Sequence, residues 1–396
     1  MLYRKYRPQS FSELIGQEHL VKTLQGALMV NQVAHAYLFA GPRGTGKTTV
    51  ARLLAKAVNC SLRNHQPEKF RGPRVSTGSS INNQQLVKSN KLEVGDSKLT
   101  VASAEPCNKC HICSDFNHGN AIDLIEIDAA SNRGIDEIRN LKESVNFAPN
   151  ICKYKVYLID EVHMLTKEAF NALLKTLEEP PAHVIFILAT TDSEKVPDTI
   201  KSRTQFFRFK RIPNSLMVQR LALIAKSENI KASEEALNLI AQSGNGSMRD
   251  AESNFSKLIS FTGQNVSLLD VQEVLGLVPF NFVAEFVACL SAKKKNEAIK
   301  YINHAYESGI EMDQFLKSIT DFFRMLLIAK MSPASLVAYK NELPSEHMQL
   351  IASYAVNFDS MAITKALRVF LNAGQHLKTS PIPQLPLELA VVEFLE

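Results

Sequence analysis

The sequence predicts an α/β domain built on a parallel five-stranded sheet, followed by two domains made of helices. Short apolar runs alternate with helical patterns from Ala36 to about Phe209, as in parallel sheets whose strands are joined by helices. A glycine-rich segment separates the first apolar run from the helical pattern after it. Strand signals disappear after Pro213, and helical periodicity continues to the end of the chain.

Five strands are expected in the first domain, and one helix between two of them has clear boundaries. Thr166 is suited to cap the start of this helix, Phe170 and Leu173 fall on one face, and Pro180 follows its end. The expected strands are 36–40, 123–128, 155–159, 184–189 and 205–209. Ligand-binding residues are expected at the carboxyl ends of these strands, which share one edge of the sheet.

The helical part divides into a smaller and a larger domain. Amphipathic helices are expected over 216–229 and 233–242, and a further helix follows Gly246. From about Pro279 the sequence is helical to its end. We therefore place the domains at 1–213, 214–278 and 279–396.

Length and composition agree with this division. A chain of 396 residues is too long for one ordinary core. Its 45% hydrophobic and 21% charged residues are typical of a globular protein, and a net charge of +5 neither requires nor excludes contact with nucleic acid. The N-terminus resembles no signal peptide, and every apolar run is far shorter than the ~20 residues of a membrane span. We expect a cytoplasmic protein with no membrane partner.

The glycine-rich segment is a phosphate-binding loop in the expected context. Gly41-Pro42-Arg43-Gly44-Thr45-Gly46-Lys47-Thr48 matches G-x-x-x-x-G-K-[ST] between a strand and a helix. Its glycines allow backbone N–H groups to surround phosphate oxygens, and the helix N-terminus adds partial positive charge. Lys47 is expected to neutralise the β- and γ-phosphates, and the Thr48 hydroxyl to bind Mg²⁺. The predicted nucleotide contacts in this loop are Gly41, Pro42, Arg43, Gly44, Thr45, Gly46, Lys47, Thr48 and Thr49.

Two carboxylates complete the predicted site. Asp160 and Glu161 follow the apolar strand at 155–159 and lie at the edge of the sheet where ligands bind. Asp160 is expected to hold Mg²⁺ through water, and Glu161 to orient and polarise the attacking water. Together with the loop, this pair predicts hydrolysis of a nucleoside triphosphate.

Three of the six cysteines form a metal-binding pattern. Cys107, Cys110 and Cys113 have the spacing of thiolates that share a tetrahedral zinc ion. A fourth ligand is needed, and Cys60 is the preferred candidate, with His111 as the alternative. Such a closed site is structural, and we place the zinc module at about 60–118. The two other cysteines, Cys152 and Cys289, are expected in the core.

A polar insertion interrupts the first domain. Residues 62–105 are rich in Asn, Gln, Ser, Lys and Gly and show no sustained period. Such a segment is either a solvated loop or a functional one. In the second case its basic residues would contact DNA; these are Lys69, Arg71 and Arg74.

Beyond these patterns, the chain resembles the ATPase subunits (gamma/tau) of bacterial DNA polymerase III clamp loaders, within the AAA+ group. The resemblance begins at Leu2-Tyr3-Arg4-Lys5-Tyr6-Arg7-Pro8 and extends to the region around 377–381. It is carried further by these runs: His35-Ala36-Tyr37-Leu38-Phe39, Tyr157-Leu158-Ile159-Asp160-Glu161-Val162-His163-Met164-Leu165, Leu188-Ala189-Thr190-Thr191-Asp192, Ser202-Arg203-Thr204 and Gly246-Ser247-Met248-Arg249-Asp250.

The resemblance implies roles for residues that the patterns alone leave unassigned. Tyr6, Arg7 and Pro8 would border the adenine. Thr191 and Arg249 would sense the nucleotide, and Arg203 would be an arginine finger that reaches the γ-phosphate of a neighbouring subunit. Lys47, Glu161 and Arg203 would then be catalytic. The implied fold is an AAA+ domain with an embedded zinc module, a helical lid domain and a helical collar.

The implied function is that of an ATP-driven motor subunit. The family forms a hetero-pentamer with other loader subunits, opens the sliding clamp and places it on primed DNA without reading sequence. Arg133 is an expected phosphate contact. The implied cofactors are ATP, Mg²⁺ and structural Zn²⁺. Membership of a polymerase holoenzyme would explain a nucleotidyltransferase classification, although no further carboxylate constellation for that reaction is found.

Three departures from the family and two rival functions remain at this point. Thr204 replaces the family's usual Cys, the sequence after Arg249 is more polar, and the spacer from Cys60 to Cys107 is much longer than the family's. We expect no tail of the long family form after Glu396.

A branch-migration motor would need a winged-helix domain at its C-terminus and no zinc module. A non-hydrolysing scaffold would show a decayed loop or a lost Asp-Glu pair.

Overall fold

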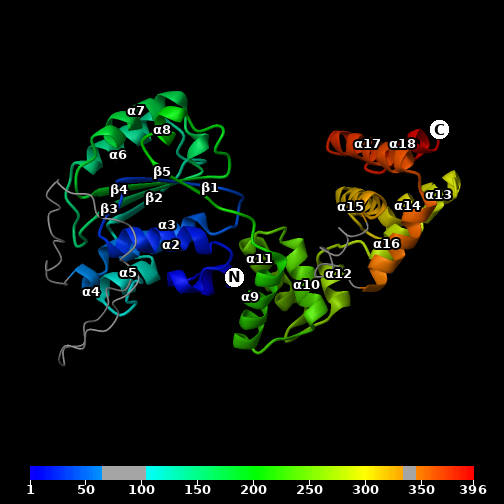
Figure 1. The fold of residues 1–396 in the computed structure, drawn as a ribbon, viewed down its shortest axis with the longest axis horizontal. Helices are drawn as coiled ribbons and strands as arrows, with labels where there is room; N and C mark the ends of the chain where they lie inside the picture. The colour runs from blue at the N-terminus through cyan, green and yellow to red at the C-terminus, as the bar shows by residue number, and fades with distance from the viewer. Residues whose placement is uncertain (65–103, 333–344) are drawn as a thin grey trace, which may run out of the picture. The chain divides into compact units, whose positions relative to one another are not determined.

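The computed structural model describes residues 1–64, 104–332 and 345–396 (Figure 1). The chain forms two compact units, one of residues 7–211 and the other of residues 1–6 together with 212–396. The proposed DNA contacts Lys69, Arg71 and Arg74 lie outside the described residues. The first unit carries the phosphate-binding loop, the Asp-Glu pair and the cysteines of the predicted zinc module.

The first unit contains the predicted parallel five-stranded sheet. Its strands run in the order β2-β3-β4-β1-β5, and every neighbouring pair is parallel. The strands are β1 (Ala36–Ala40), β2 (Leu124–Asp128), β3 (Lys155–Asp160), β4 (Val184–Thr190) and β5 (Gln205–Arg208). All residues of β1 and β4 are buried, because helices cover both faces of the sheet. The prediction of five parallel strands is confirmed, with end differences of one residue.

Two hydrophobic cores lie against the two faces of this sheet (Figure 1). Tyr37 and Phe39 of β1 pack with α2 (Glu18–Met29) and α3 (Lys47–Asn59). Ala36 and Leu38 face the other way, toward α6 (Ile135–Val145) and α7 (Lys167–Glu178). The alternation along one strand therefore builds both cores, as expected for a strand with buried faces. The shorter helices of this unit are the 3₁₀ turns Phe11–Glu13 and Val162–Met164, α4 (Ser61–Asn64), α5 (His111–His118) and α8 (Asp198–Lys201).

Helix α7 has the boundaries that its sequence predicts. The Thr166 hydroxyl accepts a hydrogen bond from the backbone N–H of Ala169 at 3.3 Å, which satisfies a donor of the first turn. Phe170 and Leu173 are buried in the core beneath the helix. The helix ends at Glu178, just before the proline pair.

The second unit is almost entirely helical. Its helices are α1 (Leu2–Lys5), α9 (Asn214–Ser227), α10 (Glu234–Ser243), α11 (Met248–Thr262), α12 (Leu268–Val274), α13 (Phe280–Ser291), α14 (Lys295–Glu307), α15 (Met312–Met331), α16 (Ser345–Asn357), α17 (Ser360–Leu377) and α18 (Leu385–Leu395). A core rich in phenylalanine, including Phe286, Phe315, Phe323 and Phe370, joins the helices from α13 onward.

The prediction that strands end at Pro213 is wrong in one detail. Lys231–Ala232 (β6) and Asn265–Val266 (β7) form a parallel pair in the second unit. Strands of two residues are too short to produce an alternating pattern that a sequence reading could detect. In the described ranges, no helix is long and apolar enough to cross a membrane.

Candidate functional site

The phosphate-binding loop joins β1 to α3. Gly46 has φ of +101°, a conformation that L-residues rarely adopt, and it directly precedes the first helical residue, Lys47. A Cβ on Gly41 would lie 2.5 Å from the backbone oxygen of Phe209, so the position accepts only glycine without a shift of the chain. The backbone therefore requires glycine at the two fixed glycine positions of the motif.

The Lys47 ammonium lies inside this loop. Its Nζ donates to the backbone oxygens of Gly41 at 2.8 Å and of Pro42 at 2.9 Å. Burial lowers the pKa of Lys47, and the nearby carboxylates of Glu161 and Asp160 oppose this shift. The loop thus holds the desolvated Lys47 ammonium against two carbonyl oxygens. An anion that enters the loop could take the place of these oxygens as the partner of the ammonium.

The loop and the Asp-Glu pair meet through Thr48 and Asp160. The Thr48 hydroxyl donates to Asp160 Oδ2 at 2.8 Å, across 112 positions of sequence. Thr48 lies in the first turn of α3, and Asp160 is the last residue of β3. A hydroxyl and a carboxylate at this separation are the oxygen ligands that Mg²⁺ uses beside phosphates.

Glu161 is held by the residue that follows β4. Its Oε2 accepts hydrogen bonds from the Thr191 N–H at 3.1 Å and from the Thr191 hydroxyl at 2.9 Å. His163 Nδ1 lies 3.4 Å from the same oxygen and 3.0 Å from the Thr190 hydroxyl. No local pattern in the sequence predicts a role for His163 or Thr190. The only signal for His163 was its position inside the run that follows Glu161.

Arg203 forms a fork of contacts within its own unit. Its Nε and Nη2 donate to Glu178 Oε1 at 2.9 and 2.5 Å, and Nη1 donates to the Thr199 carbonyl at 2.8 Å. Glu178 ends α7, and Arg203 follows α8. No local pattern predicts this pairing, because Glu178 in α7 and Arg203 in the turn after α8 are far apart in the sequence.

Tyr6 and Arg249 belong to the second unit, whereas Arg7 and Pro8 begin the first. The Tyr6 hydroxyl donates to Glu228 at 2.6 Å, which raises the pKa of Tyr6. The Arg249 guanidinium lies 5.0 Å from the centre of the Tyr3 ring, at cation–π distance. Both predicted residues therefore contact neighbours in their own unit, and Tyr3 is a neighbour that the sequence analysis missed.

Four cysteines form a cluster that fits a zinc ion. The sulfur atoms of Cys60, Cys107, Cys110 and Cys113 all lie within 4.8 Å of one another, and those of Cys107 and Cys113 are 3.8 Å apart. Sulfurs bound at about 2.3 Å around a tetrahedral zinc are separated by about 3.8 Å. The structure thus brings Cys60 to the three others across the long spacer, and His111 is not a member of this cluster.

Backbone N–H groups point at these sulfurs as well. Cys107 Sγ accepts from the N–H of Cys110 at 3.3 Å, and Cys110 Sγ accepts from that of Cys113 at 3.4 Å. Burial raises the pKa of the Cys110 thiol, but backbone and thiol hydrogen bonds outweigh burial and lower this pKa to about 6. Burial and the neighbouring Cys110 and Cys60 sulfurs raise the pKa of Cys113, so the thiols differ in how readily they form the thiolate that binds zinc.

Only one of the two remaining cysteines lies in the core as predicted. Cys289 is buried. Cys152 is half-buried in the loop before β3, where its N–H donates to Asp123 at 2.8 Å. Burial and the Asp123 carboxylate raise the pKa of the Cys152 thiol to about 12. The prediction for Cys152 is wrong because the apolar run that suggested burial belongs to a surface loop.

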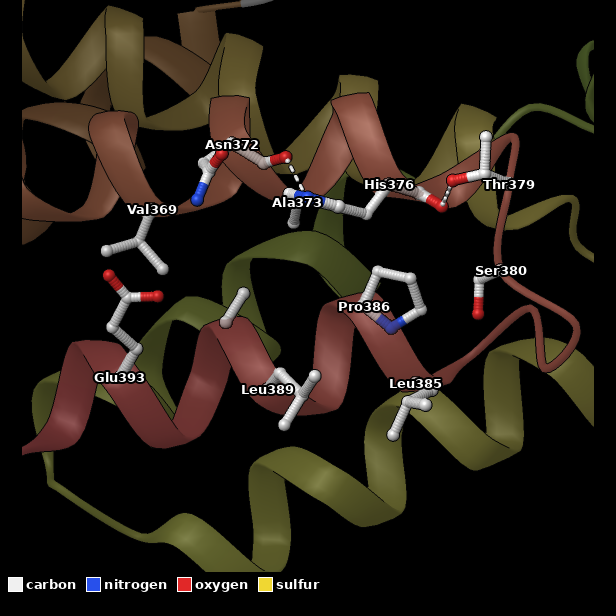
Figure 2. Close-up of a pocket in the computed structure, with 11 residues that line it drawn as sticks. Val369, Asn372, Ala373, His376, Thr379, Ser380, Leu385, Pro386, Leu389 and Glu393 are labelled. Carbon is white, nitrogen blue, oxygen red and sulfur yellow. Dashed lines mark hydrogen bonds between the residues drawn. The ribbon is translucent and has the colours of Figure 1, made fainter.

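The described residues also form a pocket away from these sites. It has a volume of about 370 Å³ and is lined by α17, α18 and the turn between them (Figure 2). Its lining includes Asn372, His376 and Glu393 as well as apolar groups such as Leu389. None of the predicted nucleotide or zinc residues lies in it.

The fold and the site define a class. A parallel sheet in this strand order, with the phosphate-binding loop after β1 and the Asp-Glu pair after β3, is the AAA+ type of P-loop domain. Family models then match three successive ranges. Residues 16–99 and 96–213 match "DNA polymerase III, delta subunit", 217–263 match "DNA polymerase III clamp loader subunit, ATPase lid domain", and 266–396 match "DNA polymerase III subunits gamma and tau domain III".

Individual relatives agree with these models. The chain is 38% identical over its full length to DNA polymerase III subunit tau of Bacillus subtilis, covering 63% of that protein. It is 31% identical over its full length to subunit gamma of Buchnera aphidicola from Acyrthosiphon pisum, covering 98% of it. Over 85% of its length it is 37% identical to subunit tau of Escherichia coli, covering 46% of that protein. The chain belongs to the gamma/tau family of DNA polymerase III subunits.

The chain spans less than two thirds of the two tau subunits that it matches. Among solved structures, the Bacillus subtilis clamp loader delta protein aligns over 94% of this chain and 99% of its own, with a TM-score of 0.38 and 14% identity. The Thermotoga maritima RuvB branch migration motor aligns over 72% of this chain and 78% of its own, with a TM-score of 0.45 and 17% identity. These two likenesses are too weak to support an inference about this chain.

Proposed function

We propose that this chain is the ATP-hydrolysing motor subunit of a bacterial clamp loader, which places the sliding clamp on primed DNA. The hydrogen bond between Thr48 and Asp160 carries the proposal, because it joins the phosphate-binding loop to the first carboxylate of the Asp-Glu pair. Membership of the gamma/tau family supports the assignment to a loader.

In this proposal the loop residues 41–49 bind the phosphates. Lys47 leaves the carbonyl groups of Gly41 and Pro42 and neutralises the β- and γ-phosphates. Thr48 and Asp160 hold Mg²⁺, which supplies positive charge to the phosphate oxygens. Tyr6, Arg7 and Pro8 border the adenine, and Arg249 contacts the phosphates from the lid.

Glu161 would act on the attacking water. Its Oε2 accepts two hydrogen bonds from Thr191, so these contacts occupy the carboxylate. We expect a bound γ-phosphate to attract the Thr191 hydroxyl, which leaves Glu161 free to orient water. Arg203 would reach the γ-phosphate of the next subunit after release from Glu178, and each complete site then needs two subunits.

The four-cysteine cluster would hold a structural Zn²⁺. All four ligands come from the protein, so no coordination position remains for a substrate. The proposed partners are the other subunits of a hetero-pentamer, the clamp and primed DNA. Arg133, exposed at the start of the turn before α6, is a proposed phosphate contact.

The test is ATP hydrolysis by the chain reconstituted with loader partners, with and without clamp and primed DNA. Strong stimulation by clamp and DNA is expected, and Lys47→Ala and Arg203→Ala should abolish it. Lys201→Ala is the matched control, since it removes a neighbouring cation that pairs only with Asp198 in the described structure. Hydrolysis that the clamp does not stimulate would assign the chain to another kind of ATPase. Inactivity in every mixture would favour a non-hydrolysing scaffold.

A further inference from the structure

The zinc module is bonded to the segment that directly follows Arg7 and Pro8. The Glu105 carboxylate accepts hydrogen bonds from the backbone N–H of Phe11 at 2.7 Å and of Ser12 at 2.9 Å. It also accepts from the Gln25 side chain at 3.0 Å. Phe11 is 1% exposed, so its N–H has little access to water and depends on this acceptor.

A buried ammonium makes a second connection to the same segment. Lys56 Nζ, on α3, donates to the Gln9 carbonyl at 2.7 Å. It also donates to the side-chain oxygens of Asn108 at 2.6 Å and Asn117 at 2.7 Å. Lys56 is 2% exposed, and three oxygens therefore satisfy its three donors away from water. The Asn108 amide also donates directly to the Gln9 carbonyl at 3.0 Å, so Lys56, Asn108 and Gln9 are bonded to one another.

The cysteine cluster positions the groups that make these contacts. Asn108 lies between Cys107 and Cys110 and has φ of +54°, so its place depends on the turn that the two sulfurs define. Asn117 lies on α5, whose N-terminal cap is Cys110 and whose first turn contains Cys113. Glu105 precedes Cys107 by two residues. If the four sulfurs are not held together, all three acceptors lose their fixed positions.

We propose that the zinc module is a positioning element for nucleotide binding: by holding residues 9–12, it fixes Arg7 and Pro8 where they border the adenine. The proposal rests on the proposed function, from which the adenine contact of Arg7 and Pro8 comes. Glu105 and Lys56 are positioning residues, because they act on the nucleotide through the backbone of residues 9–12. Loss of this link weakens the adenine contact and leaves the phosphate-binding loop unchanged.

The contacts of the adenine and those of the phosphates can be tested with two different ligands. ATP contacts both the adenine border and the phosphate-binding loop, whereas inorganic tripolyphosphate contacts the loop alone. A module that only stabilises the fold would alter the affinity for both ligands together. A module that positions residues 7–8 alters the affinity for ATP and leaves that for tripolyphosphate unchanged.

The experiment measures Kd for ATP and for tripolyphosphate by calorimetry in Mg²⁺ buffer, using the full chain. Glu105→Ala should weaken ATP binding about five- to tenfold, since hydrogen bonds to a charged acceptor are lost, and should not change tripolyphosphate binding. Glu105→Gln, a milder change, should give an intermediate loss. The matched control is Glu18→Ala, which removes a carboxylate that accepts from the Gly16 N–H without contact to the zinc module.

Zinc removal by a chelator supplies the second arm. It should weaken ATP binding in the unchanged chain and have a smaller effect in Glu105→Ala, because this variant has already lost one of the two connections to residues 9–12. Zinc content and thermal unfolding verify that the variants are folded. The proposal is overturned if the ratio of the Kd for ATP to the Kd for tripolyphosphate is the same in Glu105→Ala as in the unchanged chain, whether both values stay constant or both rise. Lys47→Ala tests the proposed function separately: if it binds ATP as well as the unchanged chain, the nucleotide site itself is wrong.

Discussion

At the scale of single residues, the charged groups of the candidate site pair with neighbours inside the first unit. Lys47 is bonded to loop carbonyls, Glu161 to Thr191, and Arg203 to Glu178. Lys47 is buried, where a charge without partners is costly, whereas Arg203 and Glu178 are partly exposed and their pair contributes less. In the proposed mechanism, Lys47 and Glu161 exchange these contacts for contacts with the nucleotide and the attacking water.

Glu161→Gln separates binding from hydrolysis. The amide keeps the size of the side chain and can still accept from Thr191, but it cannot take a proton from water. We expect hydrolysis to fall by about 10²-fold or more, with little change in ATP affinity. Single-turnover kinetics and calorimetry on the same preparation measure the two effects. A similar loss in Glu143→Gln, the matched control at an exposed carboxylate on α6 with no proposed role, would contradict a specific role for Glu161.

At the scale of elements, loops are anchored by side chains from the strand ends. Asp123, just before β2, is 1% exposed and accepts backbone N–H donors from Asn150, Ile151 and Cys152 at 2.7 to 2.9 Å. Burial raises the pKa of this carboxyl, but the three N–H donors outweigh burial and lower the pKa below its ordinary range. Asp123 thus anchors the first part of the loop that leads into β3, and so to Asp160, while the Asn59 side chain bonds the backbone of Tyr154 at its end.

Asp123→Asn should therefore destabilise the first unit by about 2–3 kcal/mol at neutral pH. Because the folded-state pKa of Asp123 is lowered, its contribution to stability is present above about pH 4 and is lost as pH falls through the lowered pKa. The difference in unfolding free energy between variant and unchanged chain should shrink on acidification. Chemical denaturation at pH 7 and at pH 3 measures it. Asp136→Asn, at an exposed carboxylate, should have no such effect.

At the scale of the whole molecule, we propose that the predicted catalytic residues act across subunits. Within the first unit Arg203 is engaged with Glu178, and no contact between Arg203 and Lys47 or Asp160 is present among the described residues. A residue placed in this way can contribute to phosphate chemistry through a neighbouring subunit. The chain is accordingly expected to hydrolyse ATP only in an assembly.

Mixing two inactive variants tests this expectation. Lys47→Ala lacks a working nucleotide site but retains Arg203, and Arg203→Ala has the opposite defect. In a loader assembled from both, some interfaces pair an intact Lys47 with an intact Arg203. Clamp-stimulated hydrolysis should return in part, by roughly the fraction of such interfaces. If the mixture stays as inactive as each variant alone, the arginine acts within its own chain.

Local patterns were sufficient wherever the function depends on neighbours in sequence. The loop 41–48, the pair Asp160-Glu161 and the spacing of Cys107, Cys110 and Cys113 each carry their chemistry within a few residues. The five strands and the capped helix α7 were likewise predicted, because period and capping are local properties. The strand pair β6 and β7 was missed because each strand has only two residues.

Tertiary structure decided which distant residues meet. The sheet order brings Thr48 to Asp160 and Thr191 to Glu161, and the turn after α3 brings Cys60 to the other cysteines. The links of Glu105 and Lys56 to residues 9–12 also exist only in the folded chain. Such contacts depend on the path of the backbone between the two partners. Neither partner carries a local sequence pattern that identifies the other. The sequence by itself therefore determined the family and the chemistry, and only the fold decided how the cysteine cluster is assembled and connected to residues 9–12.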